Sequence, residues 1–311
     1  MKNLYIIGNG FDKHHGIPSG YWDFHNWLCN RDNELVTQID ELYGYNDDLW
    51  GNFEVELGNL NIEEIATQIY NEHPADEMSD NYERTFHEGA IVASDTIGEV
   101  YNKVRNYFPE WVKSLDKANP QRKIKINTTD SFFITFNYTD TLFNLYDVSE
   151  DIVLFIHGRA AIGNDELILG HGKSSKQIQQ EAEKNFNEDT HSAYMQTVAA
   201  VEQQVNKMRK HTKTIIDSNK PVFDSISDVK DIYVYGCSLT EVDAPYYKEI
   251  VNKIDVVNVK WHVNAFDKDD ETFLKECNAK GSFLQRLGVS SNMLTFCTLN
   301  SLRLYEDNPL F

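Results

Sequence analysis

The fold is decided by residues 5–21, which read YIIGNGFDKHHGIPSGY. An apolar run ends directly at Gly8-Asn9-Gly10, and a further glycine opens the triplet Gly16-Ile17-Pro18. Glycine in such a place permits either a tight turn or the close approach of another group to the backbone. The segment therefore predicts a buried strand over Asn3–Ile7 that turns sharply into a helix.

The composition is that of an acidic, folded chain. Of its 311 residues, 41% are hydrophobic and 12% are aromatic, and the formal net charge is -20. Such a chain repels nucleic acid and anionic lipid, and the basic cluster at residues 121–125 (QRKIK) is too small to reverse this. No run approaches the ~20 apolar residues that cross a bilayer. We therefore expect neither nucleic acid nor a membrane as a partner.

Four cysteines are scattered along the chain, at positions 29, 237, 277 and 297, without a CxxC pair. The N-terminal apolar run is too short for a signal peptide, so they predict reduced thiols in a cytoplasmic protein. The adjacent His14 and His15 lack the spacing of metal ligands. The sequence therefore predicts no metal site.

Short apolar runs predict the strands of a sheet. These runs are Asn3–Ile7, Phe132–Phe136, Ile152–Ile156, Leu167–Leu169, Ile232–Tyr235, Val256–Val263 and Leu294–Thr298. Several of them are continuously apolar, as in parallel strands that are covered on both faces. Helical patterns alternate with them. The sequence thus predicts an α/β fold with a doubly wound, mostly parallel sheet of Rossmann-like type.

Two long helical segments interrupt this alternation, at about residues 21–119 and 174–210. Stretches such as NIEEIATQIYNE, residues 61–72, carry apolar side chains at helical spacing. We predict one domain over residues 1–311 in which these segments are insertions. They would cover the sheet or contact a partner, either a second copy of the chain or another protein.

Small and polar residues follow five of the predicted strands. They are Gly8-Asn9-Gly10, Asn137-Tyr138-Thr139, His157-Gly158, Gly170-His171-Gly172 and Gly236-Cys237-Ser238. The carboxyl ends of parallel strands share one edge of a sheet, and ligands bind in the crevice outside that edge. The sequence therefore predicts one ligand site there, lined by Gly8, Asn137, His157 and Gly236.

The opening glycines fail the dinucleotide fingerprint, because Lys13 occupies its third glycine position. They resemble instead the sirtuin motif GAGxSxxxGIP. The segments ITFNYTD (residues 134–140), FIHG (155–158) and YVYGCSLTEVDAPYY (233–247) are similar to later parts of sirtuins and their NAD-cleaving bacterial relatives. Together with LGHG at residues 169–172, their order most closely resembles the bacterial abortive-infection AbiH family.

This resemblance implies a sirtuin-like core of the single domain and a role in phage defence, with NAD or a related nucleotide as substrate or ligand and no prosthetic group. A partner would then be a second copy or a defence protein. Catalysis would rest on Asn137, which suits a ribose hydroxyl or the attacking water, and on His157 as base. Nucleotide contacts, including backbone N–H groups for phosphate, would come from Gly8, Asn9, Gly10, Phe11, Asp12, Gly236 and Ser238.

Departures from the sirtuin pattern leave alternatives open. Asp12 stands in place of the motif serine, and it either caps a helix or faces a ribose. The arginine after GIPDF and the four-cysteine zinc module are both missing, so protein deacetylation is not expected. His157 can also be a buried histidine bonded to backbone. Asn137 can form a turn or cap the helix that starts near Asp140, and His171 can be a turn residue. Thr240 with Asp243 fits a capping box.

Three functions therefore compete at the sequence level. The first is a phage-defence enzyme that cleaves NAD. The second is a nucleotide-sensing or partner-binding defence protein without catalysis. The third is a hydrolase of another nucleotide in which Asp12 acts as an acid.

Overall fold

The computed structural model describes residues 1–44, 47–160, 167–187, 190–266 and 269–304. The chain divides into two compact units. Unit 1 contains Met1–Gly20, Val112–Ile168 and His211–Phe311, and unit 2 contains Tyr21–Trp111 and Leu169–Lys210. The two segments predicted as helical insertions therefore come together as a unit of their own.

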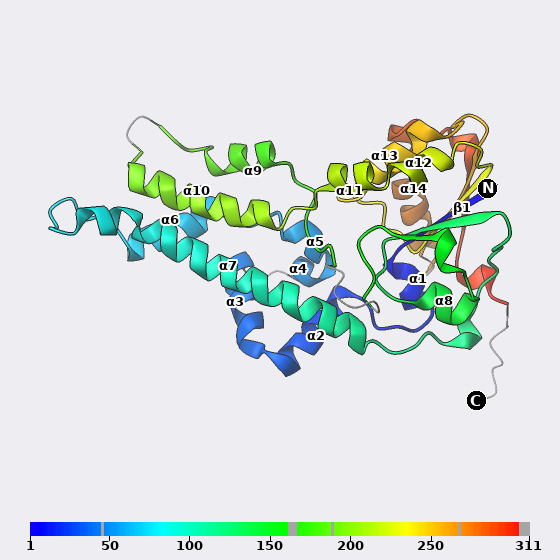
Figure 1. Cartoon of the computed structure of the whole chain (residues 1–311), viewed down its shortest axis with the longest axis horizontal. Helices are drawn as coiled ribbons and strands as arrows, with labels where there is room; N and C mark the ends of the chain where they lie inside the picture. The colour runs from blue at the N-terminus through cyan, green and yellow to red at the C-terminus, as the bar shows by residue number, and fades with distance from the viewer. Residues whose placement is uncertain (45–46, 161–166, 188–189, 267–268, 305–311) are drawn as a thin grey trace. The chain divides into compact units, whose positions relative to one another are not determined.

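Unit 1 is built on a six-stranded parallel sheet with the order β3-β2-β1-β4-β5-β6 (Figure 1). The strands are β1 (Asn3–Ile7), β2 (Ser131–Thr135), β3 (Val153–Phe155), β4 (Asp231–Tyr235), β5 (Lys260–Asn264) and β6 (Leu294–Cys297). This confirms the predicted α/β class. The order reverses direction between β1 and β4, which is the position where such sheets bind ligands.

Two of the predicted strands need correction. Leu167–Leu169 is not a strand: the N–H of Ile168 donates to the carbonyl of His157, and the segment continues into unit 2 as irregular chain. The strand predicted over Val256–Val263 begins only at Lys260. A turn precedes it, in which the N–H groups of Asn258 and Val259 donate to the carbonyl of Asp255.

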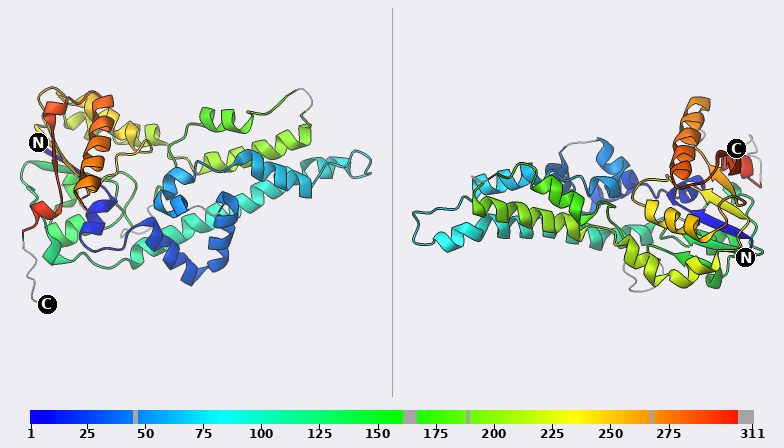
Figure 2. Two further views of the ribbon diagram at one scale, coloured as in Figure 1. Left: turned by 180° about the vertical axis from the view of Figure 1, so that it is seen from behind. Right: turned by 90° about the horizontal axis from the view of Figure 1, so that it is seen from above.

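The helices of unit 1 cover both faces of the sheet. They are α1 (Asn9–His14), α8 (Thr141–Tyr146), α11 (Thr212–Ser218), α12 (Lys220–Ser225), α13 (Ala244–Lys253) and α14 (Asp270–Arg286), the last being the long orange helix in Figure 2. Along β1 the buried side chains alternate. Leu4 and Ile6 join the core under α12, α13 and α14, whereas Tyr5 and Ile7 join the core under α1 and α8.

Unit 2 is helical throughout its regular part. Its elements are α2 (Tyr21–Arg31), α3 (Asn33–Tyr43), α4 (Asp47–Gly51), α5 (Phe53–Glu56), α6 (Ile62–Glu72), α7 (Tyr82–Ser114, which ends in unit 1), α9 (Ser175–Ala182) and α10 (Ser192–Lys207). Figures 1 and 2 show α6, α7 and α10 side by side. Small residues permit this packing, since a Cβ on Gly89 of α7 would lie 2.6 Å from the hydroxyl of Thr197 on α10.

Within the described part of the chain, no helix is long and apolar enough to cross a membrane.

Candidate functional site

The first glycines pack against the turn that follows β4. The N–H of Gly10 donates to the carbonyl of Gly236 at 2.8 Å, and a Cβ on Gly8 would lie 2.8 Å from the Cα of Cys237. Gly236 itself has φ of 74°, and a Cβ there would lie 2.0 Å from the nitrogen of Phe11. The sequence predicted that another group approaches these glycines closely. In the structure that group is the backbone after β4, at the point where the strand order reverses.

Backbone N–H groups of this segment are already engaged. The N–H of Gly8 donates to Tyr235, that of Gly10 to Gly236, and that of Phe11 to the carbonyl of Gly8. The first two bonds join the residues after β1 to the end of β4 and the turn that follows it, and the third closes the turn from β1 into α1. The nucleotide-binding role of Gly8, Gly10, Phe11 and Gly236 stays a prediction, and a phosphate held here would have to compete with these bonds.

Asn9 and Ser238 lie on the surface of this edge. The amide of Asn9 donates to the carbonyl of Ser19, and the Ser19 hydroxyl donates back to its Oδ1, so that Asn9 holds the segment after α1. The capping box predicted for Thr240 and Asp243 is wrong. Residues 240–243 form a turn, and α13 begins at Ala244 without a side-chain cap from Asp243.

Asp12 is a buried carboxylate inside α1. It does not cap that helix, because the N-cap position belongs to Gly8. Its side chain is 1% exposed, and Oδ2 accepts a hydrogen bond of 2.5 Å from the Thr139 hydroxyl. Oδ1 is buried and has no hydrogen-bond partner among the described residues. Burial raises the pKa of Asp12 to about 6, against the smaller opposing effects of the polar side chains of Thr139, Thr141 and Asn137 beside the carboxylate.

Asn137 completes this cluster from the end of β2. Its N–H donates to the hydroxyl of Thr135, which holds the backbone at the strand end. Its side chain is 6% exposed, and within the described residues its buried Oδ1 has no partner either. Asp12 and Asn137 thus bring two buried, unsatisfied oxygen atoms to one region at the carboxyl edge of the sheet. A native interior rarely leaves such atoms unpaired without a ligand or water to fill the need.

His157 lies at the end of the neighbouring strand β3, in an aromatic environment. It is 2% exposed, and its ring centroid is 5.3 Å from that of Phe136 and 6.4 Å from that of Tyr138. Its Nε2 lies 3.3 Å from the hydroxyl of Tyr246 on α13. The structure therefore places His157 beside both chain neighbours of Asn137, although its ring packs among aromatic side chains.

An arginine that the sequence analysis did not single out follows His157 closely. Arg159 makes two hydrogen bonds to Asp140, of 2.5 and 3.0 Å, and one of 2.7 Å to Glu150. Its guanidinium also lies over the ring of Phe143. In the sequence, only its position two residues after the predicted catalytic histidine could have pointed to Arg159. Its partners Asp140 and Glu150 come from other loops, and no local pattern predicts those contacts.

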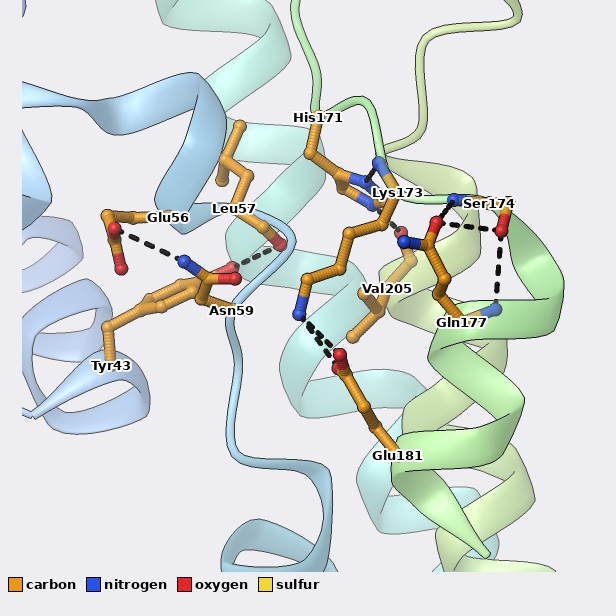
Figure 3. A network of polar contacts seen from close by, with 10 residues as sticks. All are labelled: Tyr43, Glu56, Leu57, Asn59, His171, Lys173, Ser174, Gln177, Glu181 and Val205. Atoms are coloured by element: carbon orange, nitrogen blue, oxygen red, sulfur yellow. Dashed lines mark hydrogen bonds and ion pairs between the residues drawn. The ribbon is translucent and has the colours of Figure 1, made fainter. Parts of the chain in front are cut away.

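His171 belongs to unit 2, and Figure 3 shows its contacts there. Its Nε2–H donates to the carbonyl of Val205, and its Nδ1 accepts the N–H of Lys173. A Cβ on Gly58 would lie 2.8 Å from its ring. Burial lowers the pKa of His171, against the weaker effect of its bond to Val205. With both nitrogens used and the ring packed on Gly58, His171 holds the LGHG segment against the end of α10.

His15, the residue directly after α1, has a structural role as well. The Nδ1–H of buried His15 donates to the carbonyl of Phe11, and Nε2 accepts from the hydroxyl of Tyr146. Burial lowers the pKa of His15 to about 4. Among the residues that the structure describes, no three His, Cys, Asp or Glu side chains are grouped in a way that could hold a metal ion.

Comparison with known families identifies the chain. The family model described as bacteriophage abortive infection AbiH matches residues 4–265. The chain belongs to the AbiH family. The match begins in β1 and includes every residue of the cluster at the sheet edge. No curated protein and no solved structure matches the chain. Membership of the family implies a role in phage abortive-infection defence.

Proposed function

We propose that this AbiH protein is a defence enzyme that cleaves NAD between nicotinamide and ribose. The observation that carries the proposal is the pair of buried, unsatisfied oxygens of Asp12 and Asn137. They lie at the carboxyl edge of a sheet with the 3-2-1-4-5-6 strand order, where dinucleotides bind in related architectures. An edge that keeps polar groups buried and unpaired is adapted to a ligand.

The reaction assigns a role to each group. Water adds to the anomeric carbon of the nicotinamide ribose while the carbon–nitrogen bond breaks, through an oxocarbenium-like state. Nicotinamide leaves with the bonding electron pair, and the proton of the water passes to a base. Asn137 orients the water or a ribose hydroxyl, and His157 serves as the base.

A single measurement tests this. Purified full-length protein is incubated with NAD and with ATP, and the products are identified by mass spectrometry. We expect nicotinamide and ADP-ribose from NAD, and a loss of about 10²–10⁴-fold in rate for Asn137→Ala and for His157→Ala. Asn144→Ala is the matched control, because Asn144 is exposed on α8, outside the cluster. Intact NAD after incubation with the wild-type protein would overturn the proposal.

The pKa of Asp12 supports a second candidate. A buried carboxyl group with a pKa of about 6 is suited to proton transfer near neutral pH. The chain would then be a hydrolase of another nucleotide with Asp12 as the acid. Products from ATP but not from NAD would favour this function. Binding of NAD without any product would favour a nucleotide-sensing defence protein instead.

A further inference from the structure

We propose that Asp12 and Asn137 together receive the neighbouring hydroxyl groups of a ribose, so that the site selects its nucleotide by the sugar. This inference rests on the proposed function for the assignment of the edge as a nucleotide site. Beyond that function, it assigns the ribose of the nucleotide to the position between α1 and the end of β2.

The two oxygens call for hydrogen-bond donors. Thr139 donates to one oxygen of Asp12, and the hydroxyl of Thr141 lies 3.2 Å from that of Thr139. These contacts fix the carboxylate but leave Oδ1 of Asp12 without a hydrogen-bond partner among the described residues. Oδ1 of Asn137 has none there either. Leaving a buried acceptor unsatisfied destabilises the protein, and more so when the acceptor is charged. A ligand that supplies two hydroxyl donors removes both penalties at once.

A phosphate does not fit this position. A buried carboxylate repels an anion, and the N–H groups of Gly8, Gly10 and Phe11 already donate to chain carbonyls. Arg159, after the end of β3, is held by Asp140 and Glu150. A hard cation does not fit either, because Asp12 and Asn137 offer far fewer oxygen ligands than the six or more that such ions take.

A ribose diol does match. Carboxylates bind ribose hydroxyls at the same edge of dinucleotide-binding sheets, where the hydroxyl donates and the carboxylate accepts. Asn137 accepts through Oδ1 in the same way. A buried water could satisfy the same atoms, and the ligand would displace it.

If Asp12 binds a ribose, it should lower the stability of the free protein while it raises the affinity for the ligand. In Asp12→Asn the amide oxygen can still accept from Thr139, while an NH₂ group replaces the unpaired Oδ1 beside Asn137. The substitution removes a buried charge and, with it, the unpaired carboxylate oxygen. The free protein should therefore melt at a higher temperature while its affinity for a ribose-containing ligand falls. A merely structural carboxylate would show the opposite change in melting temperature.

The probe is ADP-ribose, measured by calorimetry with full-length protein at pH 7.5, beside its two 2′-deoxy forms, one for each ribose. We expect one of the two deoxy forms to bind about 10–100-fold more weakly than ADP-ribose, the value of a hydrogen bond to a charged group. In Asp12→Asn the same deoxy form should differ from ADP-ribose by less than about threefold, because the partner of the hydroxyl is gone. Asp147→Asn, an exposed position with φ of 52° that asparagine accepts, is the control.

The outcomes separate this inference from the proposed function. NAD cleavage with equal binding of all three probes would overturn the ribose assignment alone. Hydroxyl-selective binding without NAD cleavage would overturn catalysis and leave the ribose site standing. Absence of binding, or a lower melting temperature in Asp12→Asn, would overturn the assignment of Asp12 to a ligand.

Discussion

Asp12 and His15 belong to the same short segment, and burial moves their pKa values in opposite directions. The pKa of Asp12 rises from 3.8 to about 6, and that of His15 falls from 6.5 to about 4. The folded state thus binds the Asp12 proton more tightly than the unfolded chain does. Its contribution to stability is complete below pH 3.8 and is lost as the pH rises through about 6. His15 contributes fully above pH 6.5, and its contribution is lost as the pH falls through about 4.

Asp12→Asn should remove one of these two opposing contributions. We expect the variant and the wild type to be equally sensitive to urea near pH 3.5. The variant should become more stable by up to about 3 kcal/mol as the pH rises past 6, the value of a shift of roughly two pKa units. Its own stability should increase from pH 4 to pH 6.5, since the contribution of His15 is then no longer offset. Urea unfolding at a series of pH values measures both. A constant difference between variant and wild type at every pH would contradict the assignment.

At the scale of elements, the turn after β4 sets the geometry of the sheet edge. Gly236 combines a φ of 74° with contact to the nitrogen of Phe11 and the carbonyl oxygen of Gly8. Gly288 has a φ of 103°, yet the space around it is open. Alanine at Gly288 should therefore cost only the backbone strain, roughly 1–2 kcal/mol.

Gly236→Ala adds a clash with the backbone to that strain, so its loss of stability should clearly exceed that of Gly288→Ala. Thermal unfolding of the two variants side by side measures the difference. An equal loss would mean that β1 and the turn after β4 can separate without cost. The role assigned to the glycine contact would then be wrong.

Much of the fold follows from local sequence, because fully buried parallel strands read as continuous apolar runs. β1 was predicted at its observed bounds, and the sheet class followed from the alternation of strands and helices. Leu167–Leu169 was misread because its buried leucines share the hydrophobicity of a strand, whereas strand formation depends on a partner elsewhere in the chain.

The candidate site was only partly predictable. Asn137 and Asp12 were singled out as candidates because each belongs to a recognisable motif. The contact between Asp12 and Thr139 joins residues 127 positions apart, and no local pattern encodes it. The same holds for the ion pairs of Arg159 with Asp140 and Glu150, which depend on how the loops after β2 and β3 fold back.

At the scale of the whole molecule, assembly stays a prediction. An enzyme that destroys an essential metabolite must be restrained until infection, and unit 2 exposes large apolar side chains such as Met78 and Ile91. We expect unit 2 to contact a second copy or a defence partner. If the partner is a second copy, light scattering should show a smaller particle for Ile91→Glu than for the wild type. A strict monomer that cleaves NAD without any added factor would contradict this expectation.

The C-terminal part of the chain supports the sheet edge from outside the family match, which ends at residue 265. Phe283 and Leu284 of α14 belong to the core of the sheet. Buried Lys280 on the same helix donates to the carbonyl of Asn264 at 2.8 Å, and Oδ1 of Asn264 accepts the N–H of Gly236. A chain of contacts therefore runs from α14 through β5 to the glycine turn.

Lys280→Met should break this chain while keeping the length of the side chain. The carbonyl of Asn264 loses a charged donor and Glu276 loses its ion-pair partner, which should cost about 1–3 kcal/mol. Because Asn264 then holds the turn at Gly236 less firmly, affinity for ADP-ribose should fall together with stability. Lys275→Met, at an exposed position of the same helix, should change neither. Thermal unfolding and calorimetry of both variants provide the test. A loss of stability in Lys280→Met, together with the wild-type affinity for ADP-ribose, would contradict the prediction. The sheet edge would then be independent of α14, and the site would lie entirely within residues 4–265, which the family model matches.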